Sequence, residues 1–541
     1  MNVNGSSIAD TRWTIRSISS VQRLVPVLLS VFLTYGALNP PLAEAAPPGS
    51  TNRVFPILTP PPSPTPRIQG ARITGVRPGS PFLFRIPATG KRPMQFLAQD
   101  LPDGLHLDAT TGIITGAVAQ EGTYRVQLTA TNALGSFQRE LRVVVGSTLA
   151  LTPPMGWNSW YIHYDRVSDK IMREAADQMI ASGMADFGYQ YVNIDDCWMV
   201  KVGSDDPELG GPTRDAEGRM LPNRRFPSMR GMTDYIHSKG LRAGLYTSPG
   251  PKTCAGFEGS YGHEAIDAKT FAAWGFDFLK YDWCSYGEKA GGKNLEHLRK
   301  PYEVMWAELL RQNRDIVHNL CQYGMGEVWN WGGTVGHSWR TTGDLGLEKS
   351  KELPGFYSIG LSNARHWEKA KPGAWNDPDY LLIGWVGDAH KMGVGVETTL
   401  TADEQYSYMS LWSLMAAPLI FSGDMARLDA FTLNVLCNHE VIDLNQDPLG
   451  RQAKILRQTP MEFVLAKDLE DGSKAVGLFN LGEKPREQTV TWKDLNLGSE
   501  KRGVRDVWRQ RDIQGFQDSF TAVVPRHGVV LIRIAGSPAK P

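Results

Sequence analysis

The segment Phe276–Cys284, FDFLKYDWC, ends a short apolar run with residues that are able to do chemistry. A buried strand that only packs a core has no need of Lys280 and Asp282 near its end. These two residues are separated by one position, so on a strand their side chains point to the same face. A neighbouring ammonium group favours the ionised form of a carboxyl group, which suits a nucleophile.

A second acid, Asp344 in the segment RTTGDL, follows another short apolar run. Cleavage of a glycosidic bond needs two carboxyl groups, one acting as nucleophile or base and the other, kept protonated, as acid. Arg340 lies four residues before Asp344 and falls on the same face of an extended chain. Asp282 and Asp344 are therefore candidates for a glycosidase pair, and structural salt bridges are the alternative interpretation.

The composition agrees with a carbohydrate enzyme. The chain has 541 residues, with 57 basic and 57 acidic side chains, so no net charge favours a nucleic-acid partner. Its 16 tryptophans, many among Gly, Asn and Asp, are typical of sugar sites, where ring faces need flat aromatic partners. No Cys/His cluster indicates a metal. We expect a carbohydrate partner and no metal or cofactor.

The elements that would position these acids alternate between short apolar runs and helical patterns from residue 151 to 448. The runs include YQYVNIDDCW, LRAGLYTS, FDFLKYDWC, DIVHNLCQYG, SWRTTGDL and LIFSGD. Such alternation predicts a (β/α)8 barrel, whose chemistry lies at the carboxyl ends of the strands. Lys280, Asp282 and Asp344 would lie at that end.

The first 45 residues have the pattern of an export signal. Arg12, Arg16 and Arg23 precede the apolar run 24–38, and residues 43–45, Ala-Glu-Ala, fit a cleavage site. An uncleaved anchor is the alternative, but the run is shorter than the roughly 20 residues that a membrane span needs. We therefore expect an exported protein, extracellular or periplasmic, with no membrane span in the mature chain.

Three further segments flank the barrel. Residues 46–67 contain PPPSPTP, which indicates a stiff linker. Residues 68–147 alternate short strand patterns with turns, which predicts a small immunoglobulin-like β-sandwich acting as a spacer or as a glycan-binding module. Residues 449–541 lack helical patterns and predict a C-terminal antiparallel β-sandwich domain. The chain is thus expected to be a multidomain protein with a central barrel.

Several motifs occur in order across residues 153–452 and resemble glycoside hydrolase family 27, of clan D, the retaining α-galactosidases and α-N-acetylgalactosaminidases. They are PPMGWNSW, YVNIDDCWM, SKGLRAGLY, FLKYDWC, WRTTGD, WNDPDYLLIG, LWSLMAAPLIFSGD and NQDPLGRQ. The weaker N-terminal resemblance is to immunoglobulin-like modules appended to exported enzymes. The family resemblance implies hydrolysis of terminal α-galactosides without a cofactor.

Carried over by position, the resemblance implies a role for each matching residue. Asp282 would be the nucleophile and Asp344 the acid/base, with carboxyl groups roughly 5–5.5 Å apart. Asp195 and Asp196 would read the 4- and 6-hydroxyls of the sugar. The remaining implied substrate-binding residues are Trp160, Tyr246, Cys254, Lys280, Gln322 and Arg340, and Cys254 would form a disulfide with Cys284.

The chain departs from the family at Gln322, in the motif CQYG. Many family α-galactosidases have a glutamate there, facing the sugar 2-position, whereas the N-acetylgalactosaminidases have smaller residues. A glutamine can donate and accept hydrogen bonds and leaves little room for an acetamide. We therefore expect galactose, and keep α-N-acetylgalactosaminide, β-L-arabinopyranoside and isomaltodextran as alternatives. A non-catalytic glycan-binding protein is a remote alternative.

Overall fold

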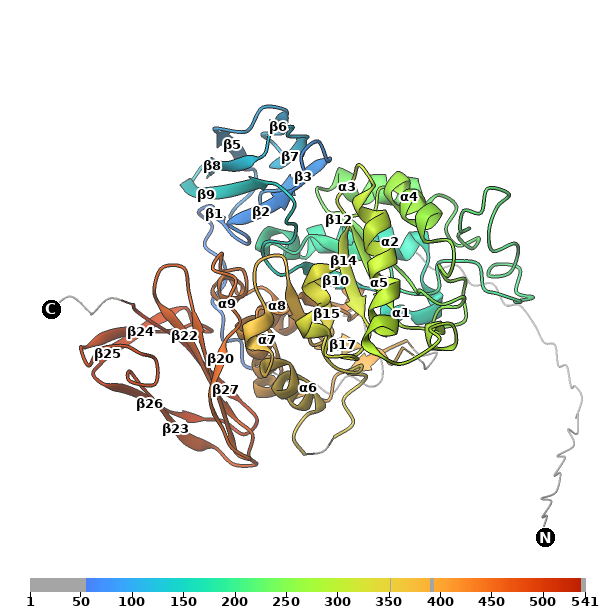
Figure 1. Cartoon of the computed structure of the whole chain (residues 1–541). Coiled ribbons are helices and arrows are strands. Elements are labelled where there is room, and N and C mark those ends of the chain that lie inside the picture. Colours follow the sequence, from blue (N-terminus) through green and yellow to red (C-terminus); the bar gives the residue numbers. More distant parts are fainter. Residues whose placement is uncertain (1–54, 351, 390–393, 537–541) are drawn as a thin grey trace, which may run out of the picture. The chain divides into compact units, whose positions relative to one another are not determined.

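The computed structural model describes residues 55–350, 352–389 and 394–536 (Figure 1). The predicted export signal, 1–45, and the first part of the predicted linker lie outside the described residues. The described segments form three groups of elements along the chain, and the middle group carries the predicted site.

The middle group contains a sheet of eight parallel strands. In sheet order they are β16 (Trp375–Asp377), β15 (Ser338–Arg340), β14 (Val317–Cys321), β13 (Phe278–Asp282), β12 (Arg242–Thr247), β11 (Tyr191–Asn193), β10 (Met155–Asn158) and β19 (Leu419–Phe421). Nearly every residue of these strands is buried, as expected for a parallel sheet covered by helices. Beyond β16, Leu381 forms an isolated parallel bridge with Phe421 of β19, so the two edges of the sheet meet. The predicted (β/α)8 barrel is confirmed.

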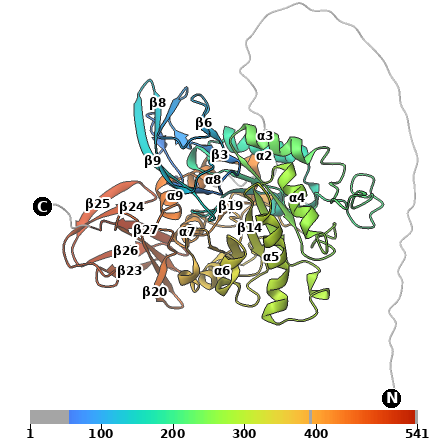
Figure 2. The ribbon, with the colours of Figure 1, turned by 45° about the horizontal axis from the view of Figure 1, so that its top comes forward.

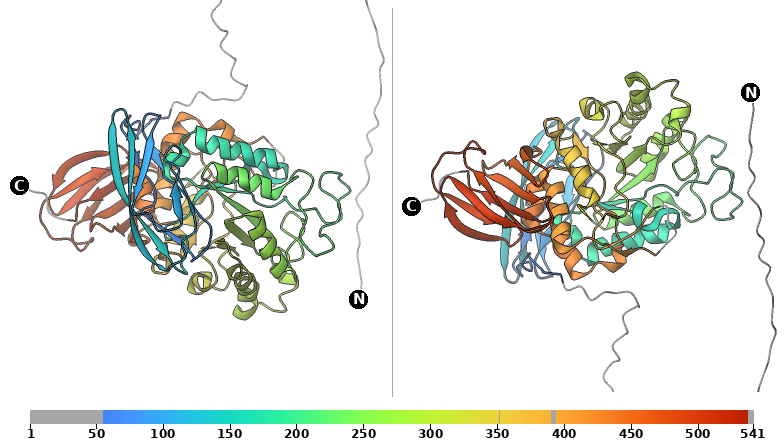
Figure 3. Two further views of the ribbon diagram at one scale, coloured as in Figure 1. Left: turned by 90° about the horizontal axis from the view of Figure 1, so that it is seen from above. Right: turned by 90° about the horizontal axis from the view of Figure 1, so that it is seen from below.

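Helices surround the barrel strands, as Figures 2 and 3 show. They are α1 (Trp160–His163), α2 (Asp169–Ala181), α3 (Met229–Ser238), α4 (Glu264–Trp274), α5 (Leu295–Leu310), α6 (Gly355–Ala364), α7 (Ala402–Leu414), α8 (Ala430–Leu436) and α9 (His439–Asn445). Several begin at a capping side chain: Ser168 accepts from the N–H of Ile171, and Thr401 forms a capping box with Glu404. These caps stabilise the first turns of α2 and α7.

The N-terminal group consists of short strands, as predicted. β2 (Ile73–Val76), β9 (Gly135–Val145), β8 (Gly122–Asn132) and β5 (Gln95–Gln99) form one sheet, and β3 (Phe82–Arg85), β7 (Ile113–Gly116) and β6 (Leu105–Leu107) form another. β1 (Arg67–Ile68) pairs with β4 (Ala88–Thr89). A separate apolar cluster that includes Phe84, Phe96, Val126 and Leu141 fills the space between them. This is the immunoglobulin-like architecture expected from the sequence.

The C-terminal group is antiparallel, again as predicted. Its larger sheet contains β20 (Lys454–Gln458), β21 (Glu462–Asp468), β22 (Lys474–Asn480), β27 (Val529–Ile534), β24 (Arg502–Asp506) and β25 (Arg511–Phe516). β23 (Arg486–Thr491) pairs with β26 (Ser519–Val524). Trp492, Val490 and Phe520 belong to the apolar cluster of this domain. Within the described residues, no helix is both long and apolar enough to cross a membrane.

Candidate active site

The barrel brings the predicted site residues to the carboxyl ends of consecutive strands. Trp160 follows β10, Asp195 and Asp196 follow β11, Tyr246 lies in β12, Lys280 and Asp282 lie in β13, Gln322 follows β14, and Arg340 ends β15. Asp344 lies four residues beyond β15, in a loop rather than on the strand. Residues far apart in the sequence therefore meet at one end of the barrel, because all eight strands are parallel.

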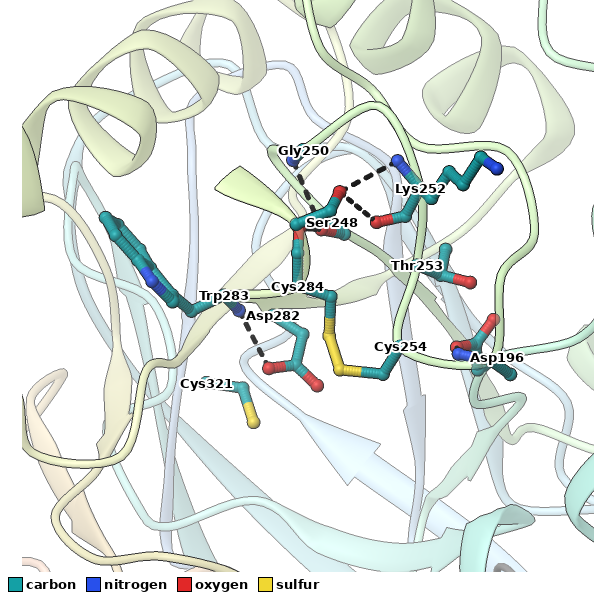
Figure 4. Close-up of a disulfide and its surroundings, with 12 residues drawn as sticks. Asp196, Ser248, Gly250, Lys252, Thr253, Cys254, Asp282, Trp283, Cys284 and Cys321 are labelled. Atoms are coloured by element: carbon teal, nitrogen blue, oxygen red, sulfur yellow. Dashed lines mark hydrogen bonds between the residues drawn. A yellow bond between two sulfur atoms is a disulfide. The ribbon is translucent and has the colours of Figure 1, made fainter. Parts of the chain in front are cut away.

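Asp282 is buried at the end of β13 and accepts three hydrogen bonds, of which Figure 4 shows the one from Trp283. The Trp283 N–H and the Tyr323 hydroxyl both donate to Oδ1 at 2.7 Å, and the Tyr246 hydroxyl donates to Oδ2 at 3.1 Å. Burial raises the pKa of Asp282, although Lys280 and Tyr323 favour the charged form. These hydrogen bonds favour the charged carboxylate, which burial disfavours.

Lys280 bonds to a different acid from the one that its spacing suggested. Its Nζ donates to Oδ2 of Asp195 at 2.9 Å, while Asp282 receives only the longer-range field of the ammonium group. Asn158 and Tyr380 donate to the same Asp195 oxygen at 2.9 and 3.2 Å. Burial opposes the charge on Lys280, but Asp195 together with Tyr380, Cys321 and Asp282 outweighs it, and the pKa of Lys280 rises well above its ordinary value. Lys280 thus fixes Asp195 directly and biases Asp282 at a distance.

Asp196 is almost completely buried, with 1% of its surface exposed. Its two oxygens accept hydrogen bonds from the backbone N–H groups of Cys197 at 2.7 Å and Ala255 at 2.9 Å. Burial is the largest cause that raises the pKa of Asp196 to about 7, and the hydrogen bonds oppose it. A carboxylate in this position is therefore held at a cost to the stability of the folded chain.

Replacing Asp196 by Asn is expected to change how stability depends on pH. The folded pKa, about 7, lies above the unfolded value, so the contribution of Asp196 to wild-type stability falls as pH rises from about 4 to about 7. Asp196→Asn lacks this titration. The melting temperature of the variant minus that of the wild type should therefore increase as pH rises across that range. Thermal unfolding at several pH values measures the difference. Asp234→Asn, on the exposed surface of α3, is the matched control, and a constant Asp196→Asn difference at all pH values would contradict the prediction.

The disulfide between Cys254 and Cys284 is present, as the family resemblance implied. Figure 4 shows it beside Asp282, and the Tyr246 hydroxyl lies 3.3 Å from the Cys284 sulfur. Ala255, the residue after Cys254, holds Asp196. The disulfide therefore ties the loop that supports Asp196 to the strand that carries Asp282. Cys197, Cys321 and Cys437 are free thiols.

Asp344 is half exposed and forms an ion pair with Arg340, 3.1 Å from Nη1. The same guanidinium nitrogen lies 3.2 Å from Oδ1 of Asp379, which is buried. Tyr161 donates to the other oxygen of Asp379 at 2.8 Å. Arg340 is thus held from one side by a buried acid and presents its charge to Asp344 on the other. This arrangement orients Asp344 from a loop that follows the strand.

Gln322 is fully buried, and only part of its hydrogen-bonding capacity is used within the described residues. Its Nε2 donates to the carbonyl oxygen of Met325 at 2.9 Å, whereas its Oε1 has no hydrogen-bond partner among the described residues. Trp160 is 8% exposed, and its ring lies 5.8 Å from the Lys280 ammonium group. Both residues lie at the same strand ends as the acids.

The sequence did not indicate four residues that contact the predicted site residues. They are Asn158 and Tyr380 on Asp195, Tyr323 on Asp282, and Asp379 on Arg340. All four lie inside or beside motifs that had been recognised, namely GWNSW, CQYG and WNDPDYLLIG. Position just past the carboxyl end of a barrel strand is the signal that could have found them.

A (β/α)8 barrel with buried acids at its strand ends, followed by an antiparallel β-domain, is an architecture that suits a glycoside hydrolase. The chain belongs to the alpha galactosidase A family, whose profile matches residues 152–447. The alpha galactosidase C-terminal β-sandwich profile matches residues 463–534, and an Ig-domain profile matches residues 63–146. The protein is thus an enzyme of the α-galactosidase type.

Curated relatives and solved structures agree with this assignment. Alpha-galactosidase 2 of Arabidopsis thaliana is 36% identical over 75% of this chain and 94% of its own length. Alpha-galactosidase A of Cellvibrio japonicus is 33% identical over 72% of this chain and 93% of its own. A solved Bacteroides fragilis structure superposes with a TM-score of 0.79 at 35% identity, covering 88% of this chain and 99% of that one.

Proposed function

We propose that the protein is an exported, retaining exo-α-galactosidase that removes terminal α-galactosyl residues through a covalent glycosyl-enzyme. The observation that carries the proposal is the pairing of its two acids. The Tyr323 hydroxyl donates to Oδ1 of Asp282 at 2.7 Å, and the Tyr323 ring lies 5.7 Å from the guanidinium carbon of Arg340. Arg340 in turn pairs with Asp344 at 3.1 Å, and this chain of contacts supports placing both carboxyl groups in one site. The disulfide supports export, since such bonds persist in oxidising compartments.

In the first step, Asp282 attacks the anomeric carbon while Asp344 donates a proton to the leaving oxygen. In the second step, Asp344 removes a proton from water, the water oxygen bonds to the anomeric carbon, and the Asp282 carboxylate leaves. Asp195 and Asp196 would accept hydrogen bonds from the sugar hydroxyls. A glucoside would not offer its 4-hydroxyl to the acid that binds this hydroxyl in galactose, and the loss of that hydrogen bond provides the basis for choosing galactose.

A panel of p-nitrophenyl glycosides tests this proposal. We expect hydrolysis of the α-galactoside to exceed that of the α-N-acetylgalactosaminide, the β-L-arabinopyranoside and the α-glucoside by at least about 100-fold in kcat/KM. Proton NMR of the first-formed sugar should show the α-anomer of galactose. Preference for another glycone, or a first-formed β-anomer, would reject the corresponding part of the proposal. No hydrolysis of any member would favour a binding protein.

Replacing Gln322 tests which sugar the site prefers, galactose or N-acetylgalactosamine. It is buried beside the nucleophile strand, and its Oε1 is an acceptor with no hydrogen-bond partner among the described residues. Gln322→Ser shortens the side chain, so we expect the ratio of kcat/KM for the acetamido sugar to that for galactose to rise about 10-fold or more. Gln312→Ser, outside the site at the end of α5, is the control. An unchanged ratio would remove Gln322 from the specificity argument.

A further inference from the structure

Tyr323 has no role assigned so far, although its hydroxyl contacts Asp282 and its ring lies over Arg340. We propose that Tyr323 is a positioning residue that holds Oδ1 of Asp282 and thereby selects Oδ2 as the atom that bonds to the sugar. The inference rests on the proposed double displacement at Asp282. It assigns a separate function to each oxygen of one carboxylate, and it predicts which of the two chemical steps depends on the tyrosine hydroxyl.

The two oxygens of Asp282 are in different environments. Oδ1 accepts two hydrogen bonds of 2.7 Å, from the Tyr323 hydroxyl and the Trp283 N–H. Oδ2 accepts one of 3.1 Å from Tyr246, whose hydroxyl also lies 3.3 Å from the Cys284 sulfur and has that alternative contact. The oxygen that holds fewer and longer hydrogen bonds keeps the more available lone pair. Oδ2 is therefore the nucleophilic atom, and Oδ1 becomes the carbonyl oxygen of the ester.

The backbone after β14 has an unusual conformation at Tyr323, the residue whose hydroxyl donates to Asp282. Tyr323 has φ of +64°, in the left-handed region that bulky residues rarely adopt. Gly324 follows with φ of +84°, and a Cβ there would lie 2.5 Å from the carbonyl oxygen of Thr341. Two successive left-handed residues turn the chain sharply at the strand end. Unfavourable conformations of this kind persist where the surrounding contacts determine them, and they cluster at functional sites.

The ring of Tyr323 makes a second contact with the opposite half of the site. The Arg340 guanidinium carbon lies 5.7 Å from the ring centroid, within range of a cation–π interaction. Arg340 in turn pairs with Asp344 at 3.1 Å. Tyr323 therefore contacts the nucleophile through its hydroxyl and the arginine of the acid/base through its ring. One side chain links the positions of both carboxyl groups.

The hydroxyl should act unequally on the two steps. During glycosylation, Oδ2 forms a bond to the anomeric carbon and the leaving-group bond breaks, so a donor on Oδ1 slightly weakens the nucleophile. During deglycosylation, water bonds to the anomeric carbon, the carbon–Oδ2 bond breaks, and its electron pair returns to the carboxylate. A donor on Oδ1 stabilises the negative charge that develops there. Loss of the hydroxyl should therefore slow the second step most.

Tyr323→Phe tests this because it removes the hydroxyl and keeps the ring. A 5-fluoro-α-galactosyl fluoride traps the glycosyl-enzyme, and the rate at which activity returns after excess reagent is removed measures deglycosylation. We expect reactivation to be about 10-fold slower than in the wild type. With p-nitrophenyl α-galactoside, kcat should fall in similar proportion and KM should fall with it, leaving kcat/KM within about 3-fold.

Tyr302→Phe is the matched control, because the Tyr302 hydroxyl is buried and has no hydrogen-bond partner in the described part of the chain. Its reactivation rate should stay within about 2-fold of the wild type. Equal reactivation of Tyr323→Phe and wild type, or equal slowing in both variants, overturns the inference. Mass spectrometry of the trapped wild type tests the double displacement separately from the role of Tyr323. Absence of the label from Asp282 overturns the double displacement and, with it, the inference about Tyr323.

Discussion

Asp282→Ala is expected to lower kcat on α-galactosides by at least about 10⁴-fold while the protein remains folded. The carboxylate supplies the bond to the anomeric carbon, and no other described acid occupies the same strand end with three hydrogen-bond donors directed at it. Its burial raises its pKa, so the charged group costs folding stability, whereas its removal leaves three hydrogen-bond donors without their acceptor. Because these effects oppose each other, the melting temperature should change little. Steady-state kinetics and thermal unfolding measure the two effects.

Azide gives this prediction a positive readout. The alanine leaves space next to the anomeric carbon on the face where Asp282 would attack. With an aryl α-galactoside, azide should restore turnover and yield the β-galactosyl azide, since it attacks from that face. Asp234→Ala, which removes an exposed carboxylate from α3, should keep activity within about 2-fold. Substantial hydrolysis by Asp282→Ala without azide would reject the nucleophile assignment.

The barrel could be predicted from the sequence because it depends on local patterns, whereas the roles of its acids came from the family resemblance. Apolar runs followed by polar residues mark strand ends, and parallel strands bring such ends together whatever the loops between them do. Asp195, Lys280 and Asp282 could therefore be placed before any contact was known. The disulfide between Cys254 and Cys284 came from the family resemblance, since five cysteines allow many pairings.

The partners of these residues could not be predicted, because they depend on side-chain direction across different strands. Spacing placed Lys280 on the face of Asp282, but its ammonium group bonds to Asp195, which follows β11, two strands away in the sheet. Tyr323 contacts Asp282 only because its backbone is left-handed, a property that a tyrosine gives no reason to expect. Asp379 holds Arg340 from a loop beyond β16. Each contact is non-local in sequence.

Asp344→Ala should have an effect that depends on the leaving group. A natural oligosaccharide has a poor leaving group and needs a proton, so we expect kcat/KM to fall by about 10²–10⁴-fold. A dinitrophenyl galactoside needs no proton to leave, so its kcat/KM should fall by less than about 10-fold. The fold should survive because Arg340, buried beneath Asp344, keeps its ion pair with Asp379. Equal losses on both substrates would count against Asp344 as the acid.

Azide distinguishes the two acids by the anomer that each variant forms. In Asp344→Ala the glycosyl-enzyme still forms at Asp282, but water lacks a base, whereas azide needs none. Azide should therefore raise kcat on the dinitrophenyl substrate and yield the α-galactosyl azide, because it displaces Asp282 from the α-face. Asp282→Ala should yield the β-azide from the same substrate. Opposite anomers from the two variants require the two carboxyl groups to lie on opposite sides of one anomeric carbon, whereas the same anomer from both would contradict the paired assignment.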